Sequence, residues 1–303
     1  KILITSNTLS SSKIISKIKL KKVIHQFFPI DTDFLVKKFI SHWKPSLALF
    51  IDSEIWPNML NNLDKNKIQT VLLNARITKK SYYRWMRVKN FSNILFNSIN
   101  LCLCSNKETV GYLKKLGAKN IKYFGNLKLA ANNKKDNLDT KNKKILNNNK
   151  FWCALSTHPG EDIFCLKTHL NIKKIHENII TIIIPRHINR VQNIKLSCEK
   201  LNLTSQILSD NEFIEKDKEI IIINSYGVAL DYLGLCKSVF IGKSMIKKLE
   251  LDGGQNPIEA AKSGCKIYHG PYVYNFQEIY ELFNKYEISE KINNEDELAN
   301  KLN

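Results

Sequence analysis

The sequence predicts an α/β protein of two Rossmann-like, doubly wound domains that face a cleft. Short apolar runs alternate with amphipathic stretches along the 303 residues. Runs that are apolar throughout and separated by helices are typical of parallel sheets covered on both faces. One polar segment, 130–150, interrupts this rhythm and divides the chain into two halves of similar size.

The predicted elements follow in order. Strands are expected in the first half at 1–5, 23–27, 47–51, 70–73, 101–104 and 121–124. In the second half they are expected at 151–155, 179–184, 220–223, 238–241 and 266–268. Amphipathic periodicity predicts helices at 33–42, 107–116, 161–175 and 191–201. Residues 137–150, rich in Asn, Lys and Asp, are predicted to be a linker between domains at 1–136 and 151–303.

Composition narrows the class of partner. Lys and Arg number 47 against 28 Asp and Glu, which gives a formal net charge of +19. This surplus favours an anionic partner, either nucleic acid, an acidic membrane surface or a phosphorylated small molecule. Lys, Asn and Ile are frequent throughout, so we attribute much of the charge to compositional bias. No platform of interleaved aromatic and basic residues is present, and we expect no nucleic-acid partner.

The seven cysteines show neither a Cys-x-x-Cys pair nor a metal-type spacing with histidine, and most lie in apolar runs. We therefore expect a reduced, cytoplasmic setting with neither a disulfide framework nor a zinc site. No apolar run approaches the ~20 residues of a membrane span. Because Lys1 opens directly on a strand pattern without an initiating Met, we expect that the N-terminus is missing.

Polar residues follow six predicted strands at their carboxyl ends, which is where α/β sheets bind ligands. These groups are Asp52–Asn58, 74–76, 125–128, Ser156–Glu161, 185–187 and 242–244. Each can also be an ordinary loop, and Asp52 with Glu54 can be a turn pair. Arg186 and His187 form the strongest anion-binding candidate here, because the guanidinium bonds phosphate in a bidentate manner.

The stretch 252–261 combines two glycines with a predicted helix start. Glycines tolerate φ > 0 and let a backbone turn approach a ligand closely. Asn256 suits the N-cap, Pro257 the first helical position, and Glu259 the third residue of a capping box. Such a helix start attracts phosphate through its free N–H groups and its dipole. The alternative is an ordinary well-capped helix.

Several catalytic classes lack their motif. The sequence has no Gly-x-Ser-x-Gly elbow, so nucleophilic Ser/His/Asp catalysis is not supported. It has neither a Walker A motif nor Gly-x-Gly-x-x-Gly, so ATPase and dinucleotide-binding functions are not supported either.

Eight motifs occur in a fixed order: Ile24–Asp31, Asp52–Asn58, Asn74–Arg76, Gly125–Lys128, Ser156–Glu161, Pro185–His187, Gly253–Glu259 and Gly270–Phe276. In this order the chain resembles the 3-deoxy-D-manno-octulosonic acid (Kdo) transferases of lipopolysaccharide synthesis over essentially its whole length. The resemblance implies an inverting, metal-independent GT-B glycosyltransferase that needs no cofactor. Its donor would be CMP-Kdo and its acceptor the lipid A precursor lipid IVA, at the cytoplasmic face of the bacterial inner membrane.

The resemblance also assigns roles to residues. It implies that CMP is bound by Pro185, Arg186, Gly227, Val228, Ala229, Asn256, Pro257, Ile258 and Glu259. It gives Asp52 a part in stabilising the transition state and matches Lys128 to a basic catalytic position. Arg186 and helix N-termini would stabilise the charge that develops on the departing phosphate. Carboxylates would favour the oxocarbenium-like sugar.

The chain departs from the family pattern in three ways. The family's general base, a glutamate in Ser-x-Gly-Glu after the first strand, and the family's membrane anchor would both precede Lys1. Val228 stands where the family has glutamate. Gln255 replaces a histidine, and Lys243 replaces a glycine. We therefore expect the chain to bind its donor better than it turns the donor over. The alternative is a catalytically impaired protein on the same scaffold that binds a nucleotide-sugar or a lipid phosphate.

An anionic lipid acceptor implies a surface that contacts the inner membrane. Basic and apolar side chains of the first half are expected to face the bilayer, namely Lys13, Lys17, Lys19, Lys21, Lys22, Arg84, Trp85 and Arg87. A solvated charged face is the alternative.

Overall fold

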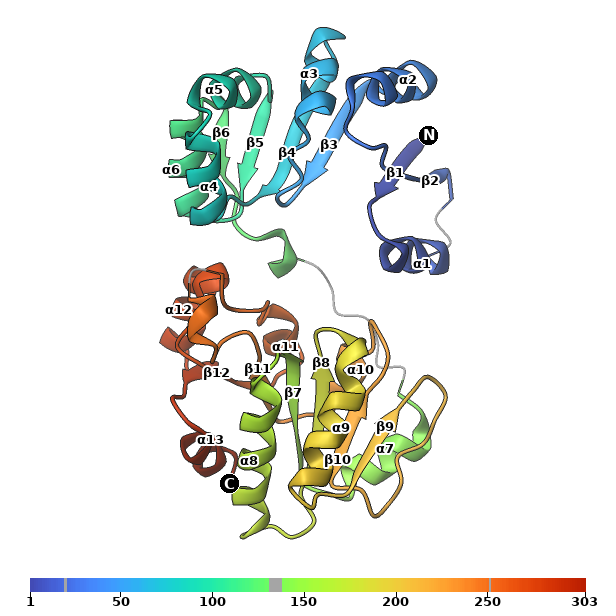
Figure 1. Cartoon of the computed structure of the whole chain (residues 1–303), viewed down its shortest axis with the longest axis vertical. Coiled ribbons are helices and arrows are strands. Elements are labelled where there is room, and N and C mark those ends of the chain that lie inside the picture. The colour runs from blue at the N-terminus through green and yellow to red at the C-terminus, as the bar shows by residue number, and fades with distance from the viewer. Residues whose placement is uncertain (19–20, 131–137, 251) are drawn as a thin grey trace. The chain divides into compact units, whose positions relative to one another are not determined.

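A computed structural model describes residues 1–18, 21–130, 138–250 and 252–303. The chain divides into two compact units, Lys1–Leu127 and Lys128–Asn303 (Figure 1). Every strand pair within the described residues is parallel, as the apolar runs predicted. None of the helices in these residues is long and apolar enough to cross a membrane.

The first unit contains two parallel sheets. The smaller pairs β1 (Ile2–Ser6) with β2 (Val23–Phe27), and α1 (Leu9–Lys17) connects these strands. The larger has the order β3 (Leu47–Ile51), β4 (Gln69–Ala75), β5 (Leu101–Cys104) and β6 (Ile121–Tyr123). The other α-helices of this unit are α2 (Asp33–Trp43), α3 (Pro57–Lys65), α4 (Lys79–Met86), α5 (Lys89–Asn97) and α6 (Lys107–Leu116).

The two sheets of the first unit are joined by side chains rather than by a strand pair. The Asp31 carboxylate accepts hydrogen bonds from the backbone N–H groups of Asn58 (3.0 Å) and Met59 (2.9 Å) at the start of α3. The ring of Phe28 lies 5.0 Å from that of Trp56. These contacts fix the segment after β2 against α3, because a carboxylate satisfies N–H groups that a helix start leaves free.

The second unit has one seven-stranded sheet. Its order is β13 (Ser289–Lys291), β12 (Lys266–His269), β11 (Ser238–Ile241), β7 (Phe151–Thr157), β8 (Ile180–Pro185), β10 (Ile220–Ile223) and β9 (Ser205–Leu208). Its helices are α7 (Thr140–Asn147), α8 (Glu161–Lys173), α9 (Val191–Lys200), α10 (Ala229–Leu233), α11 (Ile258–Lys262), α12 (Gln277–Lys285) and α13 (Glu295–Leu302).

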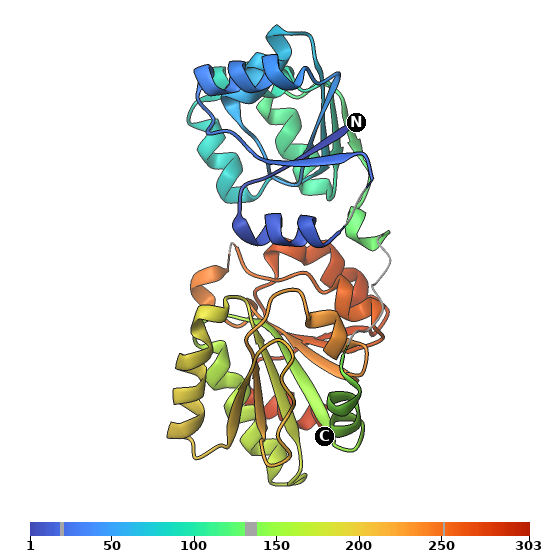
Figure 2. The same cartoon turned by 90° about the vertical axis from the view of Figure 1, so that its right-hand side faces the viewer.

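Helices cover both faces of this sheet, as Figures 1 and 2 show. Successive side chains of a strand point to opposite faces, and the buried core accordingly splits into two clusters. Trp152 and Ala154 pack with residues of α8, α9 and α13. Cys153 and Leu155 pack with residues of α7, α10, α11 and α12. Burial on both faces therefore accounts for the apolar runs 151–155 of β7 and 182–185 of β8, and for the four isoleucines of β10.

The prediction of a linker at 137–150 is wrong for α7. Leu146 is fully buried in the core of the second unit. The buried Asn142 accepts a hydrogen bond from the N–H of Ile214 (2.8 Å) and donates one to the carbonyl of Glu212 (3.1 Å). Asparagine thus acts here as a core contact, which composition alone does not reveal. Residues 131–137 lie outside the described residues, as do the side chain of Lys17 and the residue Lys19 from the predicted membrane face.

Two strands were not predicted, β9 and β13. Both are outermost in the sheet and carry polar residues, Ser205 and Gln206 in one and Glu290 and Lys291 in the other. An edge strand is exposed along one side, so it does not require the continuous apolar run by which the central strands were recognised.

Candidate functional site

The carboxyl ends of β7 and β11 mark the topological switch point of the second unit. From β7 the chain adds β8, β9 and β10 on one side, and it then returns to add β11, β12 and β13 on the other. In open α/β sheets ligands bind outside the carboxyl ends of the strands at such a point. The loop after β7 and the turn after β11, residues 242–245, therefore border the candidate site.

The buried carboxylate of Glu161 connects these two segments. Oε2 accepts hydrogen bonds from the backbone N–H groups of His158 (2.9 Å) and Lys243 (2.7 Å). Oε1 accepts from those of Ser244 (2.8 Å) and Met245 (3.0 Å). Glu161 is 1% exposed and begins α8, where the helix dipole also favours a negative charge. The switch point thus contains an internal anion held by four amides.

A second polar group lies beside it. The buried Asp162 carboxylate accepts a hydrogen bond from the Thr157 hydroxyl (2.8 Å) and forms an ion pair with Arg190. Arg190 also donates to the Thr157 carbonyl (2.8 Å). Burial raises the pKa of Asp162, although Thr157 and Arg190 act in the opposite direction. Burial has the opposite effect on a base, and it lowers the pKa of the half-buried His158. The Nδ1 of this histidine lies 3.0 Å from the Ser156 carbonyl oxygen. These groups brace the loop after β7.

The residues to which CMP binding was assigned lie at this same edge of the sheet. Pro185 ends β8 and is buried, and the exposed Arg186 follows it, with its backbone N–H bonded to the Thr157 carbonyl (3.1 Å). Gly227, with φ 81°, Val228 and Ala229 lead from β10 into α10. Since β8 and β10 are neighbours, Arg186 and Gly227 follow adjacent strands. The segment 256–259 lies beyond β11, across the switch point.

The helix start at 256–259 differs from the prediction by one residue. The short helix α11 begins at Ile258, so Pro257 precedes it and is not its first residue. Pro257 therefore occupies the N-cap position that we predicted for Asn256. Asn256 still satisfies a backbone N–H of the helix start, because its Oδ1 accepts from the N–H of Ile258 (3.1 Å). Pro257 and Ile258 are buried, and Glu259 is exposed.

The two glycines at 253 and 254 are required by the protein's own backbone. A Cβ at Gly253 would overlap the carbonyl oxygen of Tyr272, and one at Gly254, where φ is 88°, would lie 2.9 Å from the Cα of Val273. Gly253 accepts from the N–H of Asn275 (2.9 Å), and Gly254 donates to the carbonyl of Lys243 (2.6 Å). The close approach that we had expected toward a ligand is therefore made to the segment 272–275.

The first unit carries a comparable group at the carboxyl ends of β3 and β4. Asp52 (φ 60°) and Asn74 (φ 54°) both have left-handed backbone conformations. The side-chain amide of Asn74 donates to Asp52 Oδ1, and its Oδ1 accepts from the N–H of Leu127 (2.9 Å). Lys128 is exposed in the 3-10 turn Leu127–Leu129 that follows. Left-handed non-glycine residues cost about 1–3 kcal/mol and cluster at functional sites.

Ser156 (φ 57°) and Lys243 (φ 59°) repeat this pattern in the second unit. Ser156 is the last residue but one of β7, and Lys243 comes two residues after β11. Asp52 and Asn74 lie similarly close to the carboxyl ends of the adjacent strands β3 and β4. Among the described residues, four of the ten left-handed non-glycine positions therefore coincide with the edges at which the polar motifs were expected, and the other six lie elsewhere. The sequence did not reveal these conformations, since none of the four positions is glycine.

Other predicted residues have structural partners. The Trp56 indole N–H donates to Glu54 Oε2 (2.6 Å), and its ring packs on Phe28. Trp85, which we expected to face a bilayer, is instead half-buried and packs edge-on against Phe96 at 5.4 Å. Within the described residues, no group of three or more His, Cys, Asp or Glu side chains could hold a metal ion.

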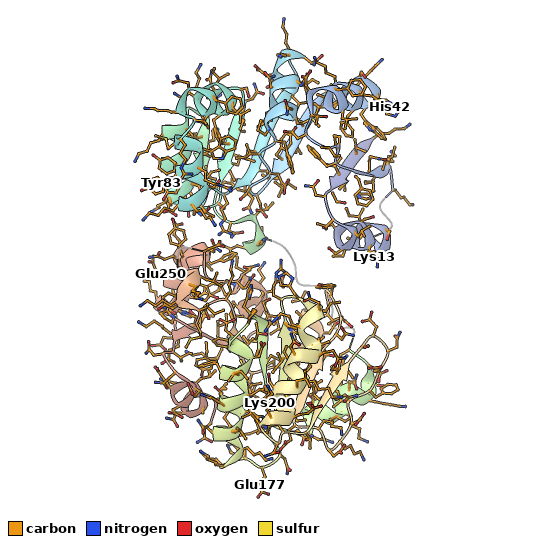
Figure 3. All side chains as sticks on the ribbon, viewed as in Figure 1. Lys13, His42, Tyr83, Glu177, Lys200 and Glu250 are labelled. Atoms are coloured by element: carbon orange, nitrogen blue, oxygen red, sulfur yellow. The ribbon has the colours of Figure 1, made fainter. Side chains whose placement is uncertain are left out.

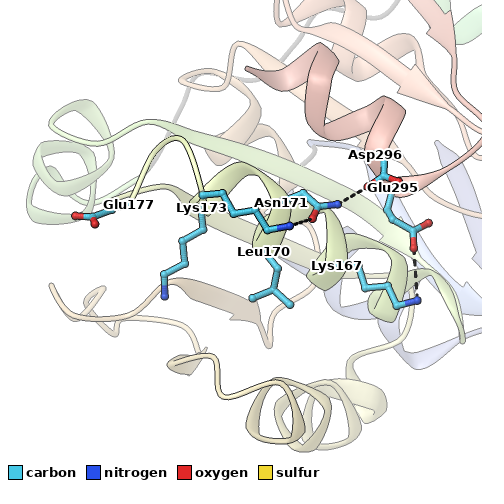
Figure 4. Close-up of a pocket in the computed structure, with 8 residues that line it drawn as sticks. Lys167, Leu170, Asn171, Lys173, Glu177, Glu295 and Asp296 are labelled. Carbon is cyan, nitrogen blue, oxygen red and sulfur yellow. Dashed lines mark hydrogen bonds and ion pairs between the residues drawn. The ribbon is translucent and has the colours of Figure 1, made fainter.

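A hollow of ≈ 740 Å³ on the second unit lies elsewhere, between α8 and the start of α13 (Figure 4). Within it, Lys167 forms an ion pair with Glu295 at 3.4 Å, and the side-chain amide of Asn171 donates to Asp296 at 2.6 Å. Helix α8 runs back from the carboxyl end of β7, so its second half lies away from the switch point. This hollow is therefore not part of the candidate site.

The fold defines a class. The chain matches a crystal structure of UDP-N-acetylglucosamine 2-epimerase over 99% of its length and 78% of that chain, with a TM-score of 0.65 and 12% identity. It matches a glycosyltransferase from Rickettsia africae over 99% of its length and 78% of that chain, with a TM-score of 0.59 and 11% identity. The protein therefore has the α/β architecture of GT-B proteins, as predicted.

Sequence comparisons find similarity to the Kdo transferases. Residues 1–131 match the family described as 3-Deoxy-D-manno-octulosonic-acid transferase (kdotransferase). The 3-deoxy-D-manno-octulosonic acid transferase of Rickettsia felis is 30% identical over 304 residues, covering 100% of this chain and 64% of the relative. That of Haemophilus influenzae is 29% identical over 268 residues, covering 86% and 61%. The chain is thus similar to the Kdo transferases, and it spans less than two thirds of these relatives' length.

Proposed function

We propose that the protein transfers Kdo from CMP-Kdo to lipid IVA in lipopolysaccharide synthesis. The observation that carries this proposal is the coincidence of family motifs with the carboxyl edge of the second sheet. Arg186, Gly227 and Asn256 belong to three loops of that edge, after β8, after β10 and beyond β11. Strands β10 and β11 are three positions apart, about 14 Å. A ligand that spans these loops must be larger than phosphate, which favours a nucleotide-sugar.

The roles of the residues follow from the charge of the reaction. Departure of CMP leaves negative charge on a phosphate, which the exposed guanidinium of Arg186 can stabilise as it develops. Asp52 is held by Asn74 in a fixed conformation, and its carboxylate would favour the oxocarbenium-like sugar. Lys128 would add positive charge. In this proposal, protein side chains stabilise both the negative charge on the phosphate and the positive charge on the sugar, so no metal ion is required.

Binding of the donor is tested by calorimetry with CMP and CMP-Kdo. Replacing Arg186 by Ala should weaken CMP binding about tenfold or more, since it removes a charge-assisted bond. Lys200→Ala is the matched control, because it removes one positive charge at an exposed position at the far end of α9 (Figure 3). Equal affinity of the wild type and Arg186→Ala would refute the assigned pocket.

Transfer is tested with CMP-Kdo and lipid IVA. We propose that the 303 residues bind the donor, and that a chain in which the family's Ser-x-Gly-Glu segment stands before Lys1 transfers Kdo. If the extended chain binds CMP-Kdo and still transfers nothing, the second function is favoured. That function is nucleotide-sugar or lipid-phosphate binding without catalysis, and Val228 motivates it because it stands where a carboxylate is expected.

We also propose that the first unit contacts an anionic membrane surface. Large apolar side chains are exposed on or beside α4 and α5: Tyr83 (57%), Val88 (49%), Phe91 (50%) and Ile94 (73%). Arg84 and Arg87 are exposed among them. Mixed basic and apolar surfaces bind anionic bilayers.

The membrane proposal is tested by co-sedimentation with phosphatidylglycerol vesicles at low salt. Phe91→Ser with Ile94→Ser should release most of the bound protein. Equal binding of this variant and the wild type would contradict the proposed surface. Phosphatidylcholine vesicles serve as the uncharged control.

A further inference from the structure

Glu161 has no role assigned in the transfer reaction, yet its bonds reach the backbone that leads into the proposed nucleotide loop. We propose that Glu161 is a positioning residue that fixes the turn 242–245 and, through this turn, the loop Gly253–Asn256. The inference rests on the proposed function, in which residues 256–259 contact the nucleotide.

The first step is the saturation of the carboxylate. Two oxygens offer about four acceptor sites, and four backbone N–H groups occupy them at 2.7–3.0 Å. Three of these N–H groups belong to consecutive residues, Lys243, Ser244 and Met245. Only a carboxylate can accept from all four, because a glutamine amide has one accepting oxygen and its NH₂ group would face the donors.

The second step is the conformation of the turn. Lys243 has φ 59°, which an L-residue with a side chain adopts only under constraint. Gly242 has no room for a side chain, since a Cβ there would lie 2.5 Å from the carbonyl oxygen of Ser156. The amides of 243–245 converge on one carboxylate because the turn is bent in this way. Removing the carboxylate therefore removes the interaction that opposes the strain.

The third step carries the constraint from the turn to the loop. The Lys243 carbonyl accepts from the N–H of Gly254 (2.6 Å). The Ser244 carbonyl accepts a hydrogen bond from the backbone N–H of Tyr272 (2.9 Å). The Ser244 hydroxyl oxygen accepts one from the backbone N–H of Gly270 (2.9 Å). Gly254 in turn packs against Val273 with no space for a Cβ. A shift of Lys243 must therefore move Gly254.

The last step leads to the proposed contact residues. The Gln255 carbonyl accepts from the hydroxyl of Tyr280 (3.1 Å), a fully buried ring. The Oδ1 of Asn256 then accepts a hydrogen bond from the N–H of Ile258 (3.1 Å). Only Gln255, held by the bond from Tyr280, separates Gly254 from Asn256, so the position of Gly254 constrains that of Asn256.

The test is Glu161→Gln, with Glu177→Gln as the control. The control removes the same charge at an exposed site beyond the C-terminal end of α8 (Figure 3). Residue-resolved hydrogen exchange should show the amides of 243–245 and of Gly254 exchanging at least tenfold faster in Glu161→Gln. The amides of β8 should be unchanged, and CMP should bind about tenfold more weakly. The control should match the wild type.

The outcomes separate this inference from the proposed function. If the wild type binds no CMP, the proposed function fails, and the exchange of Gly254 alone decides the role of Glu161. Unchanged exchange at Gly254 in a folded Glu161→Gln protein overturns the inference, as does a rise that is equal in β8. If that variant does not fold, Glu161→Asp keeps the charge but shortens the side chain. Unchanged exchange at Gly254 in Glu161→Asp would then overturn the inference.

Discussion

Alanine substitutions at three glycines of the second unit separate two costs, a left-handed backbone and a blocked Cβ. Gly264 has φ 80° and nothing within 4 Å of a Cβ, so Gly264→Ala tests the backbone alone. Gly253 lacks a left-handed φ, but its Cβ would overlap the Tyr272 carbonyl, so Gly253→Ala tests the contact alone. Gly254 combines φ 88° with a Cβ contact at 2.9 Å.

The magnitudes follow from these geometries. A left-handed alanine costs about 1–2 kcal/mol, which is the loss of stability expected for Gly264→Ala. Overpacking costs about 1–3 kcal/mol. The upper part of this range applies to Gly253→Ala, because the opposing atom belongs to the backbone and cannot rotate away. Gly254→Ala combines both terms and should lose about 2–5 kcal/mol.

The assay is urea unfolding followed by the indole NMR signal of Trp152. This residue is the one tryptophan in the second unit and is 1% exposed, so its signal reports that unit separately from the first. If Gly264→Ala costs as much as Gly254→Ala, the contact with Val273 contributes nothing. A neutral Gly253→Ala would show that the loop gives way freely, and the packing argument would be refuted.

Three further changes test other features. Burial lowers the pKa of His169 from 6.5 to about 4. Because the histidine of the unfolded chain takes up a proton at a higher pH than that of the folded chain, acid favours unfolding. The free energy of unfolding should therefore fall by about 3 kcal/mol as the pH drops from 6.5 to 4. In urea titrations at several pH values, His169→Gln should abolish most of this fall, whereas the exposed His42→Gln should keep it. Lys243→Gly should raise the free energy of unfolding in urea by about 0.5–1 kcal/mol, because glycine adopts a left-handed φ without strain. A decrease would show that the contacts of the lysine side chain stabilise the fold by more than the backbone strain costs. Asp31→Ala should destabilise the first unit by about 1–2 kcal/mol in thermal unfolding, since the amide of Met59 loses its partner; an unchanged Tm would contradict this account of the cap.

The central strands could be predicted because burial on both faces leaves a continuous apolar run. The four isoleucines 220–223 form β10 with the predicted bounds. Helix α7 could not be predicted in this way, because Asn142 is buried through bonds to residues 212 and 214, about 70 positions away. Composition classifies such an asparagine with those of loops. Hydrogen bonds between residues far apart in the sequence therefore determine the structure of this segment, and local composition gives no sign of them.

The loops that form the candidate site could be predicted from the sequence, but the hydrogen bonds that connect them could not. The order of the strands places Arg186, Gly227 and Asn256 at one edge, and the resemblance assigned them before any geometry was known. The bonds from Glu161 to Lys243 join residues 82 positions apart, and no local pattern indicates them.

The division of the first unit into two sheets has a consequence for the behaviour of the chain in solution. Strand β3 is an outermost strand, and Leu47, Leu49 and Ile51 are each about half exposed on it. Strand β1 belongs to a separate pair in which Ile2 is 61% exposed. Free strand edges with apolar side chains are templates for further pairing. The net charge of +19 makes molecules of this chain repel one another, which opposes such association. Salt screens this repulsion. We therefore expect the chain to be more soluble at low ionic strength, and added salt to promote pairing of strands between molecules.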